Sequence, residues 1–471
     1  MRILLVVHYY LPKHQAGTEI YTASLARELK KRHEVAIFTS DDSHFETGEY
    51  KTGRDDYDGV PVTCVYRGQP ADFLSSYKDA ELDRIFGEYI EEYKPDLIHF
   101  QHLYRLSIGF IDEARKRKIP RVLTLADYWF ICPSIIMLRP GYVRCTGPER
   151  GIACATCGNA VGEEFAGSVA AEMLGAGKTR QYVLQAMHAL KRTLPQPMVE
   201  FAKEMKDRAV AANPNSIPQK RIDLLSARYR AMMDALRNIN LILAPSRFLR
   251  ETYVEAGVSP LIISYSDYGF EVEKFPRKPK KPFQPPLKIG YVGTLVPHKG
   301  VHVLIEAFQK VEGAVLEIHG ELTHFPNYVK SLKKLAKGKP VKFMGRFENE
   351  RAAEIMSGLD ALVVPSLWWE NSPLTIHEAF LVGTPVIASR AGGMGELVAD
   401  PMFLFEPGDA QELAKILQGF VRKPEMLRIF GDRRAEVKSI SENVDELEDV
   451  YRIVVQRAME GDSLGDTKPS S

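Results

Sequence analysis

The 471-residue sequence lacks three features that would each point to a particular class of protein. An excess of one charge is absent, because 62 Lys and Arg side chains face 61 Asp and Glu side chains, so no whole-protein field attracts nucleic acid. No apolar run reaches the roughly 18 residues of a membrane-spanning helix. The opening stretch MRILLVVHYYLP lacks the longer apolar core and cleavage site of a signal peptide, and it is typical of a first strand.

Cysteine is scarce, and four of the five thiols fall in one loop, residues 129–160. With no export signal, so few thiols indicate a reducing cytoplasm, and contact with the inner face of a membrane stays open. Cys132, Cys145, Cys154 and Cys157 have the ligand number of a structural zinc or iron–sulfur site. A redox-active or disulfide-forming set and unliganded thiols are the alternatives. A catalytic metal is not expected, because four thiolates would fill its coordination sphere.

Short apolar runs alternate with amphipathic helical stretches along most of the chain. The runs RILLVV (2–7), DLIHF (96–100) and RVLTLAD (121–127) belong to the first half, and the rhythm restarts with KIGYVG, AVLEIHG and ALVVPS in the second. Strands that alternate with helices favour parallel pairing through right-handed crossovers. The predicted fold class is therefore α/β, with two doubly wound Rossmann-like sheets.

A proline-rich segment, FPRKPKKPFQPPLK, separates the two halves, because proline fixes φ and removes a hydrogen-bond donor. Between the strands of the first half, the pattern becomes purely helical and predicts an insertion. The first domain is predicted over 1–275, with the helical insertion over about 162–238, and a linker follows over 276–286. The second domain is predicted over 287–442. A helix over 443–460, whose return to the first domain stays open, and a disordered tail over 461–471 complete the chain.

The insertion is rich in basic residues. A basic amphipathic hairpin suits an anionic lipid surface or a lipid-diphosphate acceptor, and a solvated polar face is the other interpretation. The residues in question are Lys178, Arg180, Lys191, Arg192, Lys220, Arg221, Arg228 and Arg230.

The stretch WWENSPLTIHEAFLVGTPV holds two carboxylates eight positions apart, Glu370 and Glu378. Ser372 is a good N-cap, Pro373 suits the first helical position and Gly383 is a natural stop, so a helix over 373–382 is predicted. Its N-terminus suits a phosphate. Glu370 then lies in the loop before the helix, where it can accept hydrogen bonds from sugar hydroxyls, and Glu378 can accept them from a ribose diol. A capping acid and a solvated helix Glu are the alternative.

The segment GYVGTLVPHKG predicts a strand, a turn at Gly293 and Thr294, and a helix that begins near Lys299. Lysine at a helix start places a cation where cations are disfavoured, and a diphosphate held between Lys299 and backbone N–H groups would compensate. A tight strand-to-helix turn is the simpler alternative. In the first domain, Gly17 of HQAGTEIY follows the first strand in the same way, and it would let an acceptor or a donor phosphate approach.

Together these motifs resemble the retaining glycosyltransferases of family 4, which have the GT-B fold of two Rossmann-like domains facing across a cleft. The resemblance covers about 1–125 and 235–460, and it rests on GTLVPHKG, MGRFENERAAEIMSGLDALVVPS, E-x7-E, GTPVIAS and AGGMGELV. It implies a nucleotide-sugar donor in the C-terminal domain, an acceptor at the N-terminal domain, no cofactor required for catalysis and no nucleic-acid partner.

The resemblance also implies roles for individual residues. Glu370 is expected on the donor sugar, Glu378 on the ribose and Lys299 on the diphosphate. The loop around Arg346 and Phe347 is expected near the base. The implied donor-binding set is Gly17, Gly293, Thr294, Lys299, Gly345, Arg346, Asn371, Ser372, Pro373 and Glu378.

Two positions depart from the family pattern. Thr294 stands where the family usually has an arginine, and Ala126 replaces the histidine of its His-Asp pair. Asp127 and His102 are left as first-domain catalytic candidates beside Glu370. The expected reaction is transfer of a sugar to a hydroxyl of a glycan or lipid-linked saccharide in bacterial polysaccharide biosynthesis. The alternatives are a GT-B sugar-nucleotide epimerase and a catalytically silent nucleotide-sugar-binding protein.

Overall fold

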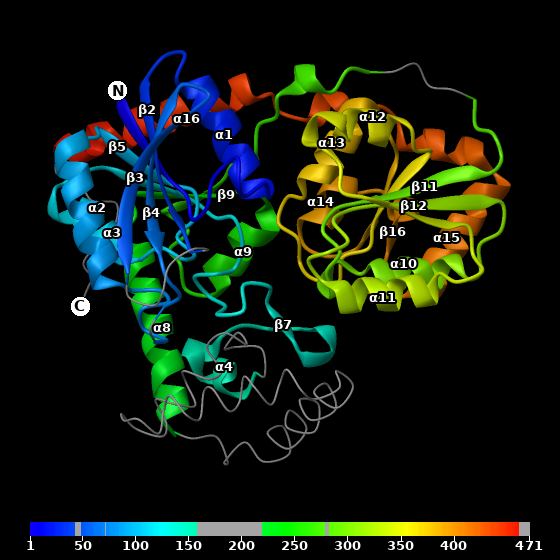
Figure 1. Cartoon of the computed structure of the whole chain (residues 1–471), viewed down its shortest axis with the longest axis horizontal. Coiled ribbons are helices and arrows are strands. Elements are labelled where there is room, and N and C mark those ends of the chain that lie inside the picture. The colour runs from blue at the N-terminus through cyan, green and yellow to red at the C-terminus, as the bar shows by residue number, and fades with distance from the viewer. Residues whose placement is uncertain (43–48, 71, 158–218, 278–281, 461–471) are drawn as a thin grey trace. The chain divides into compact units, whose positions relative to one another are not determined.

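The computed structural model describes residues 1–42, 49–70, 72–157, 219–277 and 282–460, and the chain divides into two compact units (Figure 1). Unit 1 comprises Met1–Ala244, Arg250–Tyr265 and Asp445–Ser471, and unit 2 comprises Pro245–Leu249 and Ser266–Val444. The predicted insertion lies outside the described residues up to residue 218. Among the residues described, no helix is both long and apolar enough to cross a bilayer.

Unit 1 is built on an eight-stranded sheet in the order β10-β9-β6-β5-β1-β2-β4-β3. Its strands are β1 (Arg2–Val6), β2 (Glu34–Asp41), β3 (Tyr50–Tyr57), β4 (Val60–Arg67), β5 (Leu97–Phe100), β6 (Arg121–Thr124), β9 (Leu241–Ala244) and β10 (Ile263–Tyr265); a separate antiparallel pair is β7 (Leu138–Arg139) with β8 (Val143–Arg144). All sheet neighbours are parallel except β3 and β4, an antiparallel edge that the sequence did not reveal.

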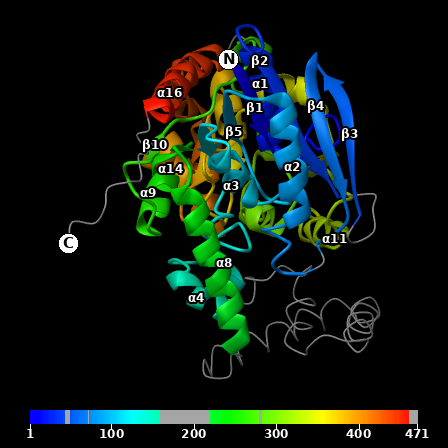
Figure 2. The ribbon, with the colours of Figure 1, turned by 90° about the vertical axis from the view of Figure 1, so that its left-hand side faces the viewer.

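Helices cover both faces of this sheet because its side chains alternate between faces. The rings of Phe38, Phe86 and Phe110 pack together on one face, under α2 and α3, which lie over the strands in Figure 2. On the other face, His99 Nδ1 lies 2.7 Å from the hydroxyl of Tyr451 in α16. The helices of the chain's first half and its C-terminus are α1 (Gly17–Leu29), α2 (Ala80–Tyr93), α3 (Gly109–Lys116), α4 (Ile152–Thr156), α8 (Gln219–Arg237), α9 (Arg247–Glu255) and α16 (Ile440–Glu460).

Unit 2 has a six-stranded, wholly parallel sheet in the order β13-β12-β11-β14-β15-β16, with α12 and α13 on one side and α10 and α11 on the other (Figure 1). The strands are β11 (Leu287–Val292), β12 (Ala314–His319), β13 (Val341–Gly345), β14 (Ala361–Val364), β15 (Val386–Ser389) and β16 (Leu404–Phe405). The helices are α10 (Val301–Phe308), α11 (Pro326–Leu335), α12 (Ala352–Ser357), α13 (Leu374–Val382), α14 (Gly393–Val398) and α15 (Ala410–Arg422). The prediction of two doubly wound parallel sheets is confirmed.

The strand order locates the places where each sheet can bind a ligand. Ligands of doubly wound sheets bind at the carboxyl ends of the strands where the order reverses. In unit 2 that point lies between β11 and β14, and in unit 1 it lies between β1 and β5. The loops after these four strands carry most of the residues singled out from the sequence.

The boundary between the units falls earlier than the proline-rich segment. The side chain of Phe270 packs into the hydrophobic core of unit 2, so the residues from Ser266 onward belong to that unit. The final helix also changes unit along its length, because the residues from Asp445 onward belong to unit 1.

Candidate functional site

Loops of unit 2 pack against one another at the carboxyl ends of its central strands. The N–H of Leu367, after β14, donates to the carbonyl of His298, after β11, at 2.8 Å. The N–H of Gly393, after β15, donates to the carbonyl of Glu370 at 2.8 Å. The loops after β11, β14 and β15 therefore form one continuous wall at the switch point.

Two glycines make this packing possible. A Cβ on Gly300 would lie 1.8 Å from the carbonyl oxygen of Pro365, and one on Gly393 would lie 1.5 Å from the carbonyl oxygen of Asn371. Gly300 also has φ of 71°, a conformation that glycine adopts without strain, as it precedes α10. The sequence thus forces the backbone of 365–372 close to the starts of α10 and α14.

Lys299 and Glu370, predicted for the diphosphate and the sugar, are joined directly. Lys299 Nζ lies 2.6 Å from Glu370 Oε1, and the Ser366 hydroxyl donates to the same oxygen at 2.7 Å. The ammonium also lies over the Trp368 ring, 5.3 Å from its centroid. Burial pushes the pKa of Glu370 upward, but the charge of Lys299 and the hydrogen bonds from Lys299 and Ser366 outweigh it and hold that pKa below its ordinary value. An ionised carboxylate and a cation are thus fixed side by side at the switch point.

Helix α13 begins at Leu374, one residue later than predicted, and Pro373 rather than Ser372 is its N-cap. The predicted stop at Gly383 is confirmed, with φ of 78°. Glu378 lies just over one turn into the helix, and burial raises the pKa of its carboxyl to about 7. At neutral pH this carboxyl is therefore poised between its two protonation states.

The Ser372 hydroxyl is engaged by two side chains and not by N–H groups of the helix start. It donates to Asp267 Oδ1 at 2.7 Å and lies 2.7 Å from His377 Nε2. The same His377 nitrogen lies 3.5 Å from Asp267 Oδ2. Sequence reasoning missed Asp267 and His377, because Asp267 lies 105 residues from Ser372 and reaches it through the fold.

The loop expected near the base, around Arg346 and Phe347, follows β13, which pairs with β12 as β12 pairs with β11. The N–H of Gly293 donates to the carbonyl of His319 at 3.0 Å, and the N–H of Gly320 donates to the carbonyl of Gly345 at 3.0 Å. The Phe347 ring lies edge-on to the His319 ring at 6.1 Å. The loops after β11, β12 and β13 therefore pack against one another.

Two further residues of the implied donor-binding set, Thr294 and Arg346, lie at the surface. Thr294 is exposed, and its carbonyl accepts a hydrogen bond from the Tyr291 hydroxyl at 2.8 Å. Arg346 is exposed as well, and no contact in the described ranges joins it to Lys299 or Glu370. Lys299 is therefore the cation that the fold fixes beside the carboxylate.

In unit 1, the structure brings His102 and Asp127 together at 2.9 Å between Nε2 and Oδ2. The N–H of Tyr104 donates to His102 Nδ1 at 2.8 Å, so the ring proton sits on Nε2 and is donated to Asp127. The N–H of Trp129 donates to Asp127 Oδ1 at 2.7 Å. Both nitrogens of His102 are occupied, and its side chain is 6% exposed against 17% for Asp127. Asp127 is thus the member of the pair that faces solvent.

Two further residues extend this cluster, and sequence reasoning missed both. His8 follows β1 as His102 follows β5, and their ring centroids lie 4.7 Å apart. His8 Nε2 lies 3.3 Å from Oε1 of the buried Glu19, whose Oε2 accepts from the N–H of Ala16. Burial, followed by the charge of His102, lowers the pKa of His8, and burial raises that of Glu19. Gly17 opens α1 beside them and is exposed.

Among the residues described, no group of three or more His, Cys, Asp or Glu side chains is placed to hold a metal ion, and the zinc or iron–sulfur site at the cysteine loop stays a prediction. Cys132 Sγ lies 3.2 Å from the Ser134 hydroxyl, and Cys145 Sγ donates to the carbonyl of Gly147 at 3.5 Å. Burial raises the pKa of Cys154 to about 12, which keeps this thiol protonated. Cys132 and Cys145 thus contact polar groups of their own loop.

One residue of the predicted basic face is in fact buried. Arg228, 4% exposed, donates to the carbonyl of Trp129 at 2.6 Å and lies over the rings of Trp129 and Tyr77. Its position in the helical pattern placed it among surface residues, and the aromatic neighbours that bury it are far away in sequence. Lys178, Arg180, Lys191 and Arg192 lie outside the described residues.

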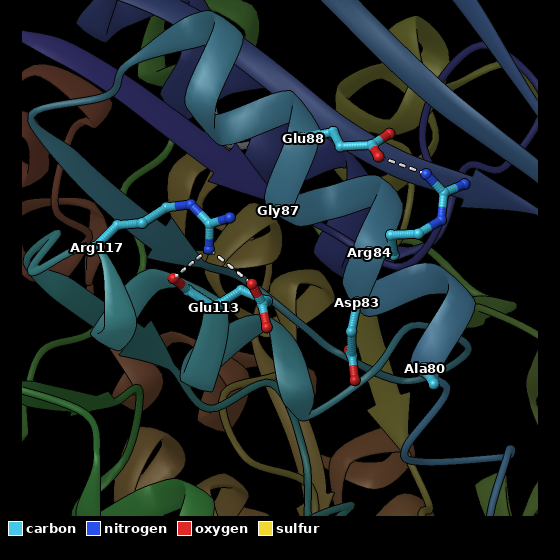
Figure 3. A pocket seen from close by; sticks show the side chains of 7 residues that line it. All are labelled: Ala80, Asp83, Arg84, Gly87, Glu88, Glu113 and Arg117. Carbon is cyan, nitrogen blue, oxygen red and sulfur yellow. Dashed lines mark hydrogen bonds and ion pairs between the residues drawn. The ribbon is translucent and has the colours of Figure 1, made fainter.

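A separate cavity of about 420 Å³ lies beside α2 and α3 of unit 1 (Figure 3). Its two arginines are neutralised: Arg117 pairs with Glu113 at 2.6 Å, and Arg84 pairs with Glu88. The cavity is lined by Ala80, Asp83, Arg84, Gly87, Glu88, Glu113 and Arg117. It contains none of the residues predicted for the site.

Two family models match separate parts of the chain. Residues 16–141 match Glycosyltransferase Family 4, and residues 272–437 match Glycosyl transferases group 1. The amylovoran biosynthesis glycosyltransferase AmsK of Erwinia amylovora is 31% identical over 38% of this chain and 46% of its own length. A glycogen synthase of Mycobacterium tuberculosis is 31% identical over 28% of this chain and 32% of its own, so the chain spans about a third of that relative.

Solved structures share the fold over nearly the whole chain. HepE of Anabaena, solved in complex with UDP and glucose, aligns with a TM-score of 0.61 and 16% identity over 96% of this chain and 99% of its own. Sucrose-phosphate synthase of Thermosynechococcus elongatus aligns with a TM-score of 0.63 and 16% identity over 97% and 99%. At this identity the likeness establishes the architecture of two Rossmann-like domains.

Proposed function

Because the chain belongs to the glycosyltransferases that join a family 4 part to a group 1 part, we propose that it transfers a sugar from a nucleoside diphosphate sugar to a hydroxyl acceptor, with retention at the anomeric carbon. The observation that carries the proposal is the Lys299–Glu370 pair at the β11/β14 switch point. A cation beside an ionised carboxylate suits a ligand whose diphosphate adjoins a hydroxyl-rich sugar.

Each part of the donor has a matching group in unit 2. The diphosphate lies against Lys299 and the first-turn N–H groups of α13, where the helix dipole favours an anion. The sugar hydroxyls donate to Glu370, and the ribose diol donates to Glu378. The base lies by the loop of Arg346 and Phe347. The UDP bound to HepE supports a uridine nucleotide as the first donor to test.

The acceptor is proposed to bind at the β1/β5 switch point of unit 1. Asp127 accepts a hydrogen bond from the attacking hydroxyl, and His102 positions Asp127 by donating to its other oxygen. The amylovoran relative and a putative colanic acid glycosyltransferase of Escherichia coli support a glycan or lipid-linked saccharide as the acceptor. Such a reaction would take place in the cytoplasm, with the lipid-linked acceptor at the inner face of the membrane.

The proposed chemistry asks little of a general base. The bond from the anomeric carbon to the donor phosphate breaks as the acceptor oxygen bonds to the same face of that carbon. The acceptor proton passes to the departing phosphate oxygen, and the diphosphate leaves with the electron pair. Lys299 and the helix amides then stabilise the charge that develops on the leaving group, which is where electrostatic catalysis has its largest effect. No cofactor takes part.

A donor panel tests the proposal against its alternatives. UDP-, GDP- and ADP-sugars are screened by thermal shift, and the best donor is then incubated with and without acceptor saccharides. A transferase releases nucleoside diphosphate in an acceptor-dependent way, an epimerase interconverts sugars without acceptor, and a silent binder does neither. Asp127→Asn is expected to raise the acceptor KM and leave the donor Kd unchanged. Loss of donor binding in that variant would contradict the assignment of Asp127 to the acceptor.

A further inference from the structure

Helix α13 has a serine placed to cap it, yet that serine does not do so. Ser372 lies two residues before Leu374 and three before Thr375, the spacing at which a Ser hydroxyl accepts hydrogen bonds from first-turn N–H groups. The helix nevertheless has no side-chain cap. Its first two N–H groups, of Leu374 and Thr375, have no partner inside the helix, whereas the N–H of Ile376 donates to the Pro373 carbonyl at 3.0 Å.

The Ser372 hydroxyl is held by two partners from other positions. It donates its proton to Asp267 Oδ1 at 2.7 Å, and His377 Nε2 lies 2.7 Å from the serine oxygen. Ser372 is 6% exposed and His377 2% exposed, so water does not compete for these bonds. The network thus removes the favoured cap of the helix that is proposed to hold the diphosphate.

Both partners are themselves fixed. The N–H of Tyr268 donates to Asp267 Oδ1 at 2.8 Å, and Asn443 Nδ2 donates to the Asp267 carbonyl at 3.2 Å. The Phe270 ring stacks on the His377 ring with centroids 4.8 Å apart. Neither partner can therefore swing away from Ser372 without breaking other contacts.

The second nitrogen of the His377 ring also supports a role at Ser372. His377 Nδ1 is buried and has no hydrogen-bond partner among the residues described. Leaving a buried acceptor unpaired is unfavourable, so stability alone does not account for a histidine here. A ring with Nε2–H aimed at Ser372 and a bare Nδ1 does account for it, because this tautomer donates to the serine oxygen while Asp267 accepts the serine proton.

We infer that Asp267 and His377 are positioning residues for the donor diphosphate. They act through Ser372: by holding its hydroxyl, they keep the first-turn N–H groups of α13 available to phosphate oxygens. The inference rests on the proposed function, since it needs a nucleoside diphosphate at this helix. It assigns a role in donor binding to two side chains that need not touch the donor.

A double-mutant cycle with UDP as the probe tests the inference. In Asp267→Ala the freed Ser372 hydroxyl caps α13 and competes with phosphate, so UDP affinity is expected to fall about fivefold, the effect of one Ser cap of about 1 kcal/mol. Ser372→Ala cannot cap α13, and its own UDP affinity is the reference for the double variant. The double variant should then recover, to within about twofold of Ser372→Ala alone.

A purely structural role predicts a different cycle. Loss of UDP affinity from Asp267→Ala that is equal with and without Ser372, or no loss at all, overturns the inference. His377→Phe, which keeps a ring but cannot hydrogen-bond to Ser372, is measured with and without Ser372→Ala, and it supplies the same comparison if Asp267→Ala does not fold. Asp409→Ala is the matched control, because Asp409 caps α15 through the N–H groups of Gln411 and Glu412, and UDP affinity should not change.

The cycle separates this inference from the proposed function. If wild-type protein binds UDP and transfers sugar but the cycle shows no recovery, the positioning role alone is wrong. If wild-type protein binds none of UDP, GDP and ADP, the proposed function fails and the inference fails with it. Steady-state kinetics give a second readout: the donor KM rises in Asp267→Ala and the acceptor KM does not.

Discussion

The Lys299–Glu370 pair should respond unequally to removal of its two partners. In Lys299→Met, the Glu370 carboxylate, 7% exposed, keeps the Ser366 hydroxyl as a donor but loses its counter-charge. In Glu370→Gln, the remaining ammonium is 28% exposed and can turn toward water. An uncompensated charge costs more the more deeply it is buried. The lysine variant is therefore expected to be the less stable of the two.

The magnitude follows from the exposure of each partner. Removing one partner of a buried pair costs about 3–5 kcal/mol, and the partial exposure of Lys299 places Lys299→Met at about 3. For a domain of the size of unit 2, that lowers the Tm by roughly 6–12 °C. Glu370→Gln is expected to cost about 1 kcal/mol. The double variant removes both charges and should lie close to Glu370→Gln.

The pH dependence gives the prediction a sign. In the wild type the folded-state pKa of Glu370 is lowered, so its stabilisation is present above the ordinary value of 4.5 and is lost as the pH falls through the lowered pKa. In Lys299→Met burial acts without the opposing cation and raises that pKa. The carboxyl is then tolerated when protonated and destabilises the fold as the pH rises. The stability gap between the two proteins should be small at pH 4 and largest above pH 7.

Tryptophan fluorescence reads out the unfolding of unit 2. The chain has three tryptophans, and two of them, Trp368 and Trp369, lie in the loop that carries Glu370. A Trp129→Phe background leaves those two as the reporters. Thermal melts at pH 4 and pH 8 are then compared among the single and double variants. A Lys299→Met protein that is as stable as Glu370→Gln at pH 8, or a gap that does not narrow at pH 4, would refute the reasoning.

Three further results are expected. As the pH rises toward 7, the affinity for a UDP-sugar should increase by up to about tenfold per pH unit, and above pH 7 it should level off. Burial raises the pKa of Glu378 to about 7, ribose hydroxyls favour its ionised form, and the phosphates of a UDP-sugar do not titrate in this range. Calorimetry on Glu378→Gln should show weaker and pH-independent binding. Gly393→Ala should destabilise unit 2 and weaken donor binding, because its Cβ would lie 1.5 Å from the Asn371 carbonyl, whereas Gly395→Ala, where nothing lies within 4 Å, should melt like wild type. Arg228→Met should lower the Tm of unit 1, because Arg228 is buried and bonds to the Trp129 carbonyl, and it should not change cosedimentation with phosphatidylserine vesicles. A loss of vesicle binding would show that Arg228 belongs to a basic surface that binds lipid.

Local rules predicted the elements of the site well and their side-chain contacts poorly. Helix α13 stops at Gly383 and α10 begins after Gly300 because glycine alone easily adopts the positive φ found there. Such ends can be predicted without knowing the fold. The cap of α13 was wrong for the opposite reason. Ser372 has the right chemistry and spacing for a cap, but Asp267 competes for its hydroxyl from 105 residues away. Propensity describes what a side chain prefers when no stronger partner is present.

The misplacement of Arg228 and the missed β3–β4 edge have similar causes. Helical periodicity shows which residues share a face, but it does not show which face is covered, and the rings of Trp129 and Tyr77 decide that for Arg228. The antiparallel pairing of β3 with β4 is set by the turn at Asp58 and Gly59, both with positive φ. The sequence of β3, YKTGRDDY, is too polar to be recognised from apolar runs.

The residues that meet at each candidate site were determined by strand order, which the sequence does not display. The loops after β11 and β14 are about 70 residues apart in sequence. They meet because the crossovers place β14 on one side of β11 and β12 on the other side of β11. That arrangement turns two separate predictions, a cation for phosphate at Lys299 and a carboxylate for sugar at Glu370, into one ion pair. The same reversal between β1 and β5 brings His8 against His102. A sequence can therefore nominate the chemical groups of such a site, while their coupling, and with it the pKa of each group, depends on which strands become neighbours.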